Sequence, residues 1–74
     1  MKPSFTNILY NLIHEHGLTI DRFNEEIGLG HNTIRAWTVK DNLPSSYLLL
    51  RIADYFDVST DYLLGRTEDR YSHK

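Results

Sequence analysis

Apolar residues recur along this chain at intervals of three and four, the spacing that places them on one face of an α-helix. The first stripe consists of Phe5, Ile8, Leu9, Leu12 and Ile13. Similar stripes, bounded by polar residues, glycine or proline, follow it, and no segment alternates apolar and polar residues as a strand would. The pattern predicts an all-α fold of five short helices, at about residues 4–15, 19–27, 31–38, 45–56 and 60–64.

Residues that favour helix ends mark these boundaries. Thr19 is a suitable N-cap for the second helix, and the apolar residues around it stand at the positions of a hydrophobic staple. The same arrangement recurs around Gly30 and Ser59. Gly28 lies between the second and third helices, where a left-handed backbone would cost an ordinary residue about 1 kcal/mol. Residues 19–40 are therefore expected to form two helices joined by a turn.

The third predicted helix has two different faces. Leu29, Ile34 and Trp37 fall on one side, which we expect to be buried. The other side carries polar groups and no acidic residue, which suits a helix lying in the major groove of DNA, where base edges present donors, acceptors and methyl groups. Ala36 on that side could contact only a thymine methyl group or nothing. The predicted base contacts are His31, Asn32, Thr33, Arg35 and Ala36.

Contacts to DNA phosphates are expected at the two ends of this helix pair. The start of the second helix offers backbone N–H groups and a hydroxyl, and the end of the third helix and the next loop offer a cation, a hydroxyl and an amide. The residue at the start of the second helix is expected to serve first as its cap. The predicted phosphate contacts are Thr19, Thr38, Lys40 and Asn42.

Composition excludes several classes of function. The chain has 74 residues and no cysteine, so we expect one compact domain without disulfides or thiolate metal sites. His14, Glu15 and His16 lack the spacing of a metal site, and no nucleophile with a base or phosphate-binding glycine loop is present. No metal, cofactor or enzyme activity is expected. The start lacks a signal peptide and no window reaches the ~18 apolar residues of a membrane span, which favours a cytoplasmic protein.

The charge distribution matters more than its sum. A net charge of −2 argues mildly against a nucleic-acid partner. Between Leu29 and Lys40, however, the only charged residues are Arg35 and Lys40. The late acidic residues are Asp54, Asp57, Asp61, Glu68 and Asp69. A mildly basic third helix on an acidic protein predicts modest non-specific affinity for DNA.

The fourth helix is apolar around more than one face, which is more than a lone surface helix needs. Residues 67–74 contain only Tyr71 as a sizeable apolar group, so we expect a flexible tail or the start of a linker after a helix-turn-helix domain at residues 1–66. The candidates for a dimer interface are Tyr47, Leu48, Tyr55, Tyr62 and Leu64.

Several short segments follow one another in a distinctive order: Gly17-Leu18-Thr19, Ile27-Gly28-Leu29, Thr33-Ile34, Leu43-Pro44-Ser45 and the run Val58 to Thr67. Together they resemble the Cro and phage-repressor helix-turn-helix family, also called XRE-like, over about Phe5 to Thr67. The closing run is typical of small regulators of Gram-positive bacteria and their prophages. The resemblance implies five helices, DNA binding by the second and third of them, and dimers that bind paired half-sites.

Two departures from this family affect the helix pair. Many relatives have Gln where Ile20 stands, and that Gln commonly contacts a phosphate. Many have Ala where Asn24 stands, a crowded position between the two helices. Asn24 must therefore find a hydrogen bond or tilt the two helices apart.

Two hypotheses of different classes follow. The first is a sequence-specific transcription regulator, a repressor of a prophage or mobile element, that binds a pseudo-palindromic double-stranded DNA operator as a dimer through its third helix. The second is the same fold used as a protein-binding module, such as an antitoxin-like or anti-repressor partner. The acidic net charge and the missing Gln favour the second hypothesis. A salt-sensitive complex with duplex DNA in a gel shift would favour the first.

Overall fold

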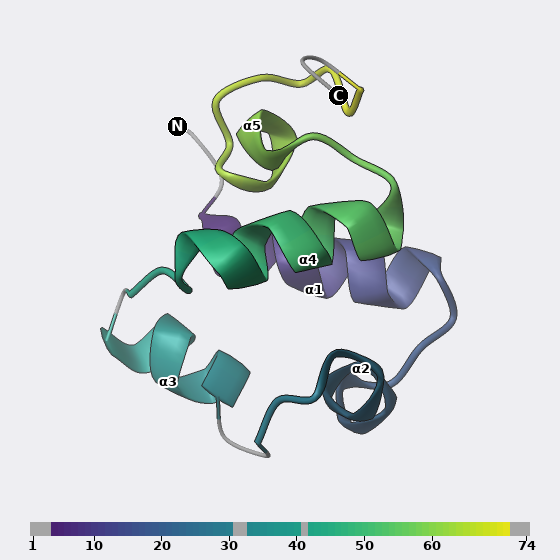
Figure 1. Ribbon diagram of the computed structural model, residues 1–74, viewed down its shortest axis with the longest axis vertical. Coiled ribbons are helices and arrows are strands. Elements are labelled where there is room, and N and C mark those ends of the chain that lie inside the picture. The colour runs from purple at the N-terminus through teal and green to yellow at the C-terminus, as the bar shows by residue number, and fades with distance from the viewer. Residues whose placement is uncertain (1–3, 31–32, 41, 72–74) are drawn as a thin grey trace.

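The computed structural model of the protein describes residues 4–30, 33–40 and 42–71. Five α-helices and no strand occur within these ranges, which confirms the predicted all-α fold (Figure 1). Two of the predicted base contacts, His31 and Asn32, lie outside the described residues. None of the described helices is long and apolar enough to cross a membrane. The helices are α1 (Phe5–Glu15), α2 (Ile20–Ile27), α3 (Thr33–Lys40), α4 (Ser46–Phe56) and α5 (Thr60–Leu63).

A central pair of helices lies between the other three. In Figure 1, α1 and α4 cross the middle of the molecule, α2 and α3 lie at the lower end, and α5 lies at the upper end. The described part of the chain measures 30 × 23 × 22 Å along its principal axes. Because α2 and α3 pack onto the central helices from one side, their outer faces are left uncovered by the rest of the described chain.

Serine and threonine caps start four of the helices. In each, the side-chain oxygen accepts a hydrogen bond from the backbone N–H three residues later, at 3.0 to 3.3 Å. These bonds satisfy N–H groups that have no partner within the helix. The caps predicted at Thr19 and Ser59 are confirmed. The four caps are Ser4, Thr19, Ser45 and Ser59.

The third helix ends later than the sequence pattern suggested. We expected its end near Thr38, but α3 continues to Lys40. No glycine or proline interrupts residues 38–40, so the helical hydrogen bonds continue until the polar turn before Pro44. The backbone N–H of Asn42 then donates to the carbonyl of Trp37 at 3.0 Å. The extra half turn adds Val39 and Lys40 to the helix.

Aromatic side chains join the helices in the core. Phe23 of α2 is fully buried and stacks on Phe56 of α4, with ring centroids 5.4 Å apart. Trp37 of α3 is buried, as predicted, and meets Phe5 of α1 edge to face at 5.8 Å. Contacts of this kind add about 0.5–1.5 kcal/mol to the burial of the rings themselves. They fix α2 and α3 against the central helices.

A buried amide lies within α2 at the position that relatives commonly fill with alanine. Asn24 is only 3% exposed, and neither its Oδ1 nor its Nδ2 atom has a hydrogen-bond partner. Its backbone carbonyl accepts from Gly28 and Leu29, which closes the helix at the turn. We expected Asn24 either to find a hydrogen bond or to tilt the two helices apart. The structure shows no hydrogen bond of this side chain. A buried amide without a partner costs about 1–3 kcal/mol.

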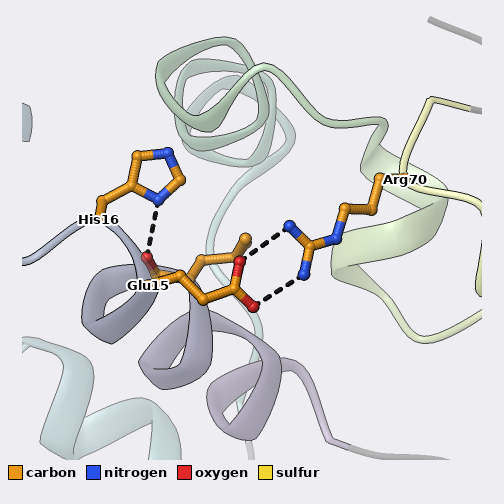
Figure 2. Close-up of polar contacts among 4 residues, drawn as sticks. Glu15, His16 and Arg70 are labelled. Atoms are coloured by element: carbon orange, nitrogen blue, oxygen red, sulfur yellow. Dashed lines mark hydrogen bonds and ion pairs between the residues drawn. The ribbon is translucent and has the colours of Figure 1, made fainter.

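The segment that we expected to be a flexible tail is attached to the fold as far as Tyr71. The Arg70 guanidinium donates two hydrogen bonds to the Glu15 carboxylate at the end of α1, at 2.8 and 2.7 Å (Figure 2). The same guanidinium lies over the Tyr62 ring, 5.2 Å from its centroid. The carbonyl of Arg70 also accepts from the N–H of Ser59. Arg70 thus connects this segment to α1 and α5, and the flexibility of residues 67–74 stays a prediction.

This ion pair makes a small part of the stability depend on pH. The two hydrogen bonds from Arg70 lower the pKa of Glu15 below its ordinary value, while partial burial opposes the shift. A carboxylate with a lowered pKa contributes stability above its unfolded pKa and loses it as the pH falls through its folded pKa. The stabilisation is therefore present at neutral pH, begins to decrease near the ordinary glutamate pKa of about 4.3, and is lost as the pH falls through the lowered pKa of the folded state.

We expect Glu15→Gln to lower the free energy of unfolding at neutral pH by less than about 1 kcal/mol, because both partners are more than a third exposed. Thermal melts of the wild type and the variant over a pH series measure the difference. It should shrink as the pH falls below about 4. A difference that stays constant down to strongly acidic pH would show that the ion pair is not its source.

Candidate functional site

The outer face of the α2 and α3 pair begins at the turn between the helices. Gly28 ends α2 with a φ of 87°, in the left-handed region that glycine adopts without strain, as predicted. Leu29 is half-buried against the core, and Ile34 is 1% exposed. The buried side of α3 is thus fixed by Ile34 and Trp37. Residues on its other side must face away from the protein.

Four residues of that other side border one open hollow on the surface of α3: Arg35, Ala36, Val39 and Lys40. All four are exposed. Three of them were predicted to contact DNA, and the structure brings these three together. Val39 joins them because the helix continues past Thr38.

The two threonines of α3 differ in what they can offer a ligand. Thr33 is half-buried, and its backbone N–H donates to the carbonyl of Gly30 at 3.3 Å. Thr38 is exposed, but its hydroxyl donates to the carbonyl of Ile34 at 3.0 Å. A phosphate oxygen needs a donor, so Thr38 could bind one only by giving up this internal hydrogen bond.

The remaining predicted phosphate contacts lie at the start of α2 and at or just beyond the end of α3. The Thr19 oxygen accepts from the N–H of Arg22 at 3.1 Å, which leaves the hydroxyl proton free to donate. Asn42 is exposed just beyond the end of α3, and Lys40 is exposed in its last turn. These groups do not form one cluster. Such spacing suits contacts along a strand of phosphates better than capture of a single small anion.

Charge divides the two helices of the pair. Helix α3 carries Arg35 and Lys40 and no acid, a local charge of +2. Helix α2 carries three exposed acids and one arginine, a local charge of −2, and that arginine pairs with Glu26 at 3.1 Å. A polyanion would therefore be attracted to α3 and not to the outer face of α2.

The family profile described as "Helix-turn-helix" matches residues 9–63, which include α2, the turn and α3. The chain belongs to this helix-turn-helix family.

One curated protein that the chain resembles is the "Uncharacterized HTH-type transcriptional regulator YobD" of Bacillus subtilis (strain 168). The two are 33% identical over 61 residues, which is 82% of this chain and 54% of that protein. The chain thus spans about half the length of this relative. No solved structure gave a significant match.

Some of the residues proposed for the dimer interface of this helix-turn-helix protein already contact other side chains of the same chain. Tyr47 is 69% exposed, whereas Tyr55 meets Phe23 and Phe56 edge to face. Arg70 lies over Tyr62. Leu48 and Leu64 are half-buried. Of the five candidates, Tyr47 is the most exposed, although Arg51 lies over its ring at 5.9 Å from the centroid.

The predicted sites left out several exposed apolar residues of the helix-turn-helix fold, among them Val39, Leu43 and Leu50. Val39 was missed because the predicted helix stopped one residue before it. Leu43 and Leu50 are 58% and 56% exposed, and they precede and follow Tyr47 in the chain. The helical spacing from Arg35 to Val39 was the signal that could have placed Val39 on the same face.

Proposed function

We propose that this chain is a sequence-specific transcription regulator that binds double-stranded DNA by laying α3 in the major groove. The observation that carries the proposal is the acid-free outer face of α3, where Arg35, Ala36 and Lys40 border one hollow opposite the buried Ile34 and Trp37. An arginine on such a face can donate two hydrogen bonds to a guanine edge. Membership of the helix-turn-helix family and similarity to a protein named as a transcriptional regulator support it.

The base contacts proposed are His31, Asn32, Thr33, Arg35 and Ala36, and the phosphate contacts proposed are Thr19, Thr38, Lys40 and Asn42. The proposal includes a dimer on a pseudo-palindromic operator and repression of a prophage or mobile element. Two successive major grooves on one side of a duplex are ~34 Å apart. Each copy of this domain carries one α3, so one copy places one such helix in one groove. Two copies are needed to read two half-sites.

A selection from a randomised duplex pool, followed by gel shifts in graded salt, tests the proposal. The expected result is enrichment of a paired motif and a complex that weakens steeply as salt rises. Sedimentation of that complex should give two chains per duplex. Failure of every duplex to be retained, at low as well as moderate salt, would refute DNA binding.

The second candidate function is a protein-binding module of the antitoxin-like or anti-repressor kind. The observation that favours it is the group of exposed acids on α2, together with the net charge of −2. A basic protein partner would be attracted to this face. This candidate predicts no salt-sensitive duplex complex in the same gel shifts.

Lys40 provides a separate test of the phosphate contacts. We expect Lys40→Ala to reduce the slope of log affinity against log salt by about one unit for each bound chain, because one cation fewer releases counterions. Arg66→Ala is the matched control, since Arg66 is an exposed cation next to α5, at the other end of the molecule. An unchanged slope for Lys40→Ala would remove Lys40 from the interface.

A further inference from the structure

The apolar part of the α3 surface is not explained by folding. Val39 is 73% exposed, the highest value among the large exposed hydrophobic residues in the described ranges. A β-branched valine is also a poorer helix former than alanine or lysine at a solvated position. Val39 therefore contributes little to the core and lowers the intrinsic propensity of its own helix. Packing within the fold therefore does not account for an apolar group at this site, whereas contact with a ligand would.

The neighbours of Val39 define what could cover it. Ala36 is three residues before it and Arg35 four residues before it, so all three side chains lie on one strip of α3. Lys40 borders the same hollow. Ala36 and Val39 thus form a small apolar patch, with the cations of Arg35 and Lys40 on either side of it. No acid of α3 opposes an anionic partner.

We infer that Ala36 and Val39 form an apolar binding site for the 5-methyl group of a thymine. Val39 is then a specificity-determining residue of the DNA contact. This inference rests on the proposed function and deepens it. The partner of this surface must meet two requirements. It must offer an apolar group to Ala36 and Val39, and it must belong to a polyanion that the flanking cations attract. In the major groove, the thymine methyl is the apolar group that base edges present. An adenine, guanine or cytosine edge placed there would lose hydrogen bonds to water without gaining one from the protein.

The flanking cations fit the same occupant. Arg35 can reach a base edge or phosphate on one side of the thymine, and Lys40 can meet a phosphate on the other. The positive charge of these two residues attracts the duplex, while the apolar patch of Ala36 and Val39 favours thymine. Lys40 thus supplies affinity, Arg35 supplies affinity and can also read a guanine edge, and Val39 supplies preference for a methylated pyrimidine.

The test replaces single thymines by deoxyuridine in a duplex selected by the wild-type protein from a random pool. This exchange removes one methyl group and leaves every hydrogen-bonding atom in place. At one thymine position in each half-site, we expect the exchange to weaken wild-type binding about four-fold, the value of one buried methyl-sized group. With Val39→Ala, the thymine and uracil duplexes should bind within about two-fold of each other at that position.

Leu50→Ala is the control, because Leu50 is an exposed apolar residue of α4 outside the α3 hollow. If that substitution affects dimer formation, both duplexes weaken equally and their ratio stays near four-fold. The inference is overturned if no thymine position is sensitive, or if Val39→Ala keeps the full discrimination. Either result leaves DNA binding itself standing, whereas failure of the selection to enrich any duplex refutes the proposed function.

Discussion

Replacement of Arg35 by alanine is expected to weaken binding to the selected duplex about 10- to 100-fold while the melting temperature stays the same. Arg35 is exposed on α3, four residues before Val39, and it forms no ion pair or side-chain hydrogen bond with the other described residues. Its guanidinium can therefore donate in bidentate fashion to a guanine edge, a contact worth about 1–3 kcal/mol. Its loss removes discrimination but no packing. Fluorescence anisotropy with labelled duplex measures the change.

Arg66→Ala is the matched control for Arg35 as well. It removes an arginine of similar exposure, whose distant contact to Asp61 is 3.9 Å long, from the opposite end of the molecule. Its expected effect on affinity is less than about two-fold. Equal losses for the two variants would mean that Arg35 contributes only general positive charge. No loss for Arg35→Ala would remove it from the predicted base contacts.

The second large effect is a gain in stability. We expect Asn24→Ala to raise the free energy of unfolding by about 1–2 kcal/mol. The wild-type amide is 3% exposed and has no hydrogen-bond partner on either side-chain polar atom. Alanine removes this desolvated group and is also the better helix former. For a domain of this size each kcal/mol raises the melting temperature by about 4–8 °C.

Asn11→Ala separates the two sources of this gain. Asn11 is an exposed residue within α1, so its replacement supplies the helix propensity of alanine without removing a buried amide. We expect a gain of at most about 0.7 kcal/mol from it. Denaturant unfolding of both variants gives the comparison. A loss of stability in Asn24→Ala would mean that the buried amide is satisfied in solution.

The helix starts and the core could be predicted because both depend on local sequence. Ser and Thr caps are effective wherever a helix begins, so Thr19 and Ser59 indicated two starts correctly. The stripe of Ile34 and Trp37 is set by helical geometry alone, and both residues are buried. The same geometry placed Arg35 on the exposed side.

Other features depend on contacts that local sequence does not contain. Arg70 and Glu15 are 55 positions apart, so nothing near either residue indicated their ion pair. The exposure of Val39 depends on where α3 ends, and helix ends are set by weak competing preferences. The missing hydrogen bond of Asn24 depends on which groups α2 meets in the core. Each of these required the packed fold.

The most direct test is amide NMR of the ¹⁵N-labelled protein titrated with the duplex selected from the random pool. If α3 reads the major groove, the largest shifts fall on Arg35, Ala36, Val39 and Lys40, and the amides of α5 stay in place. Shifts concentrated on α4 and α5, with α3 unchanged, would contradict DNA reading by the outer face of α3.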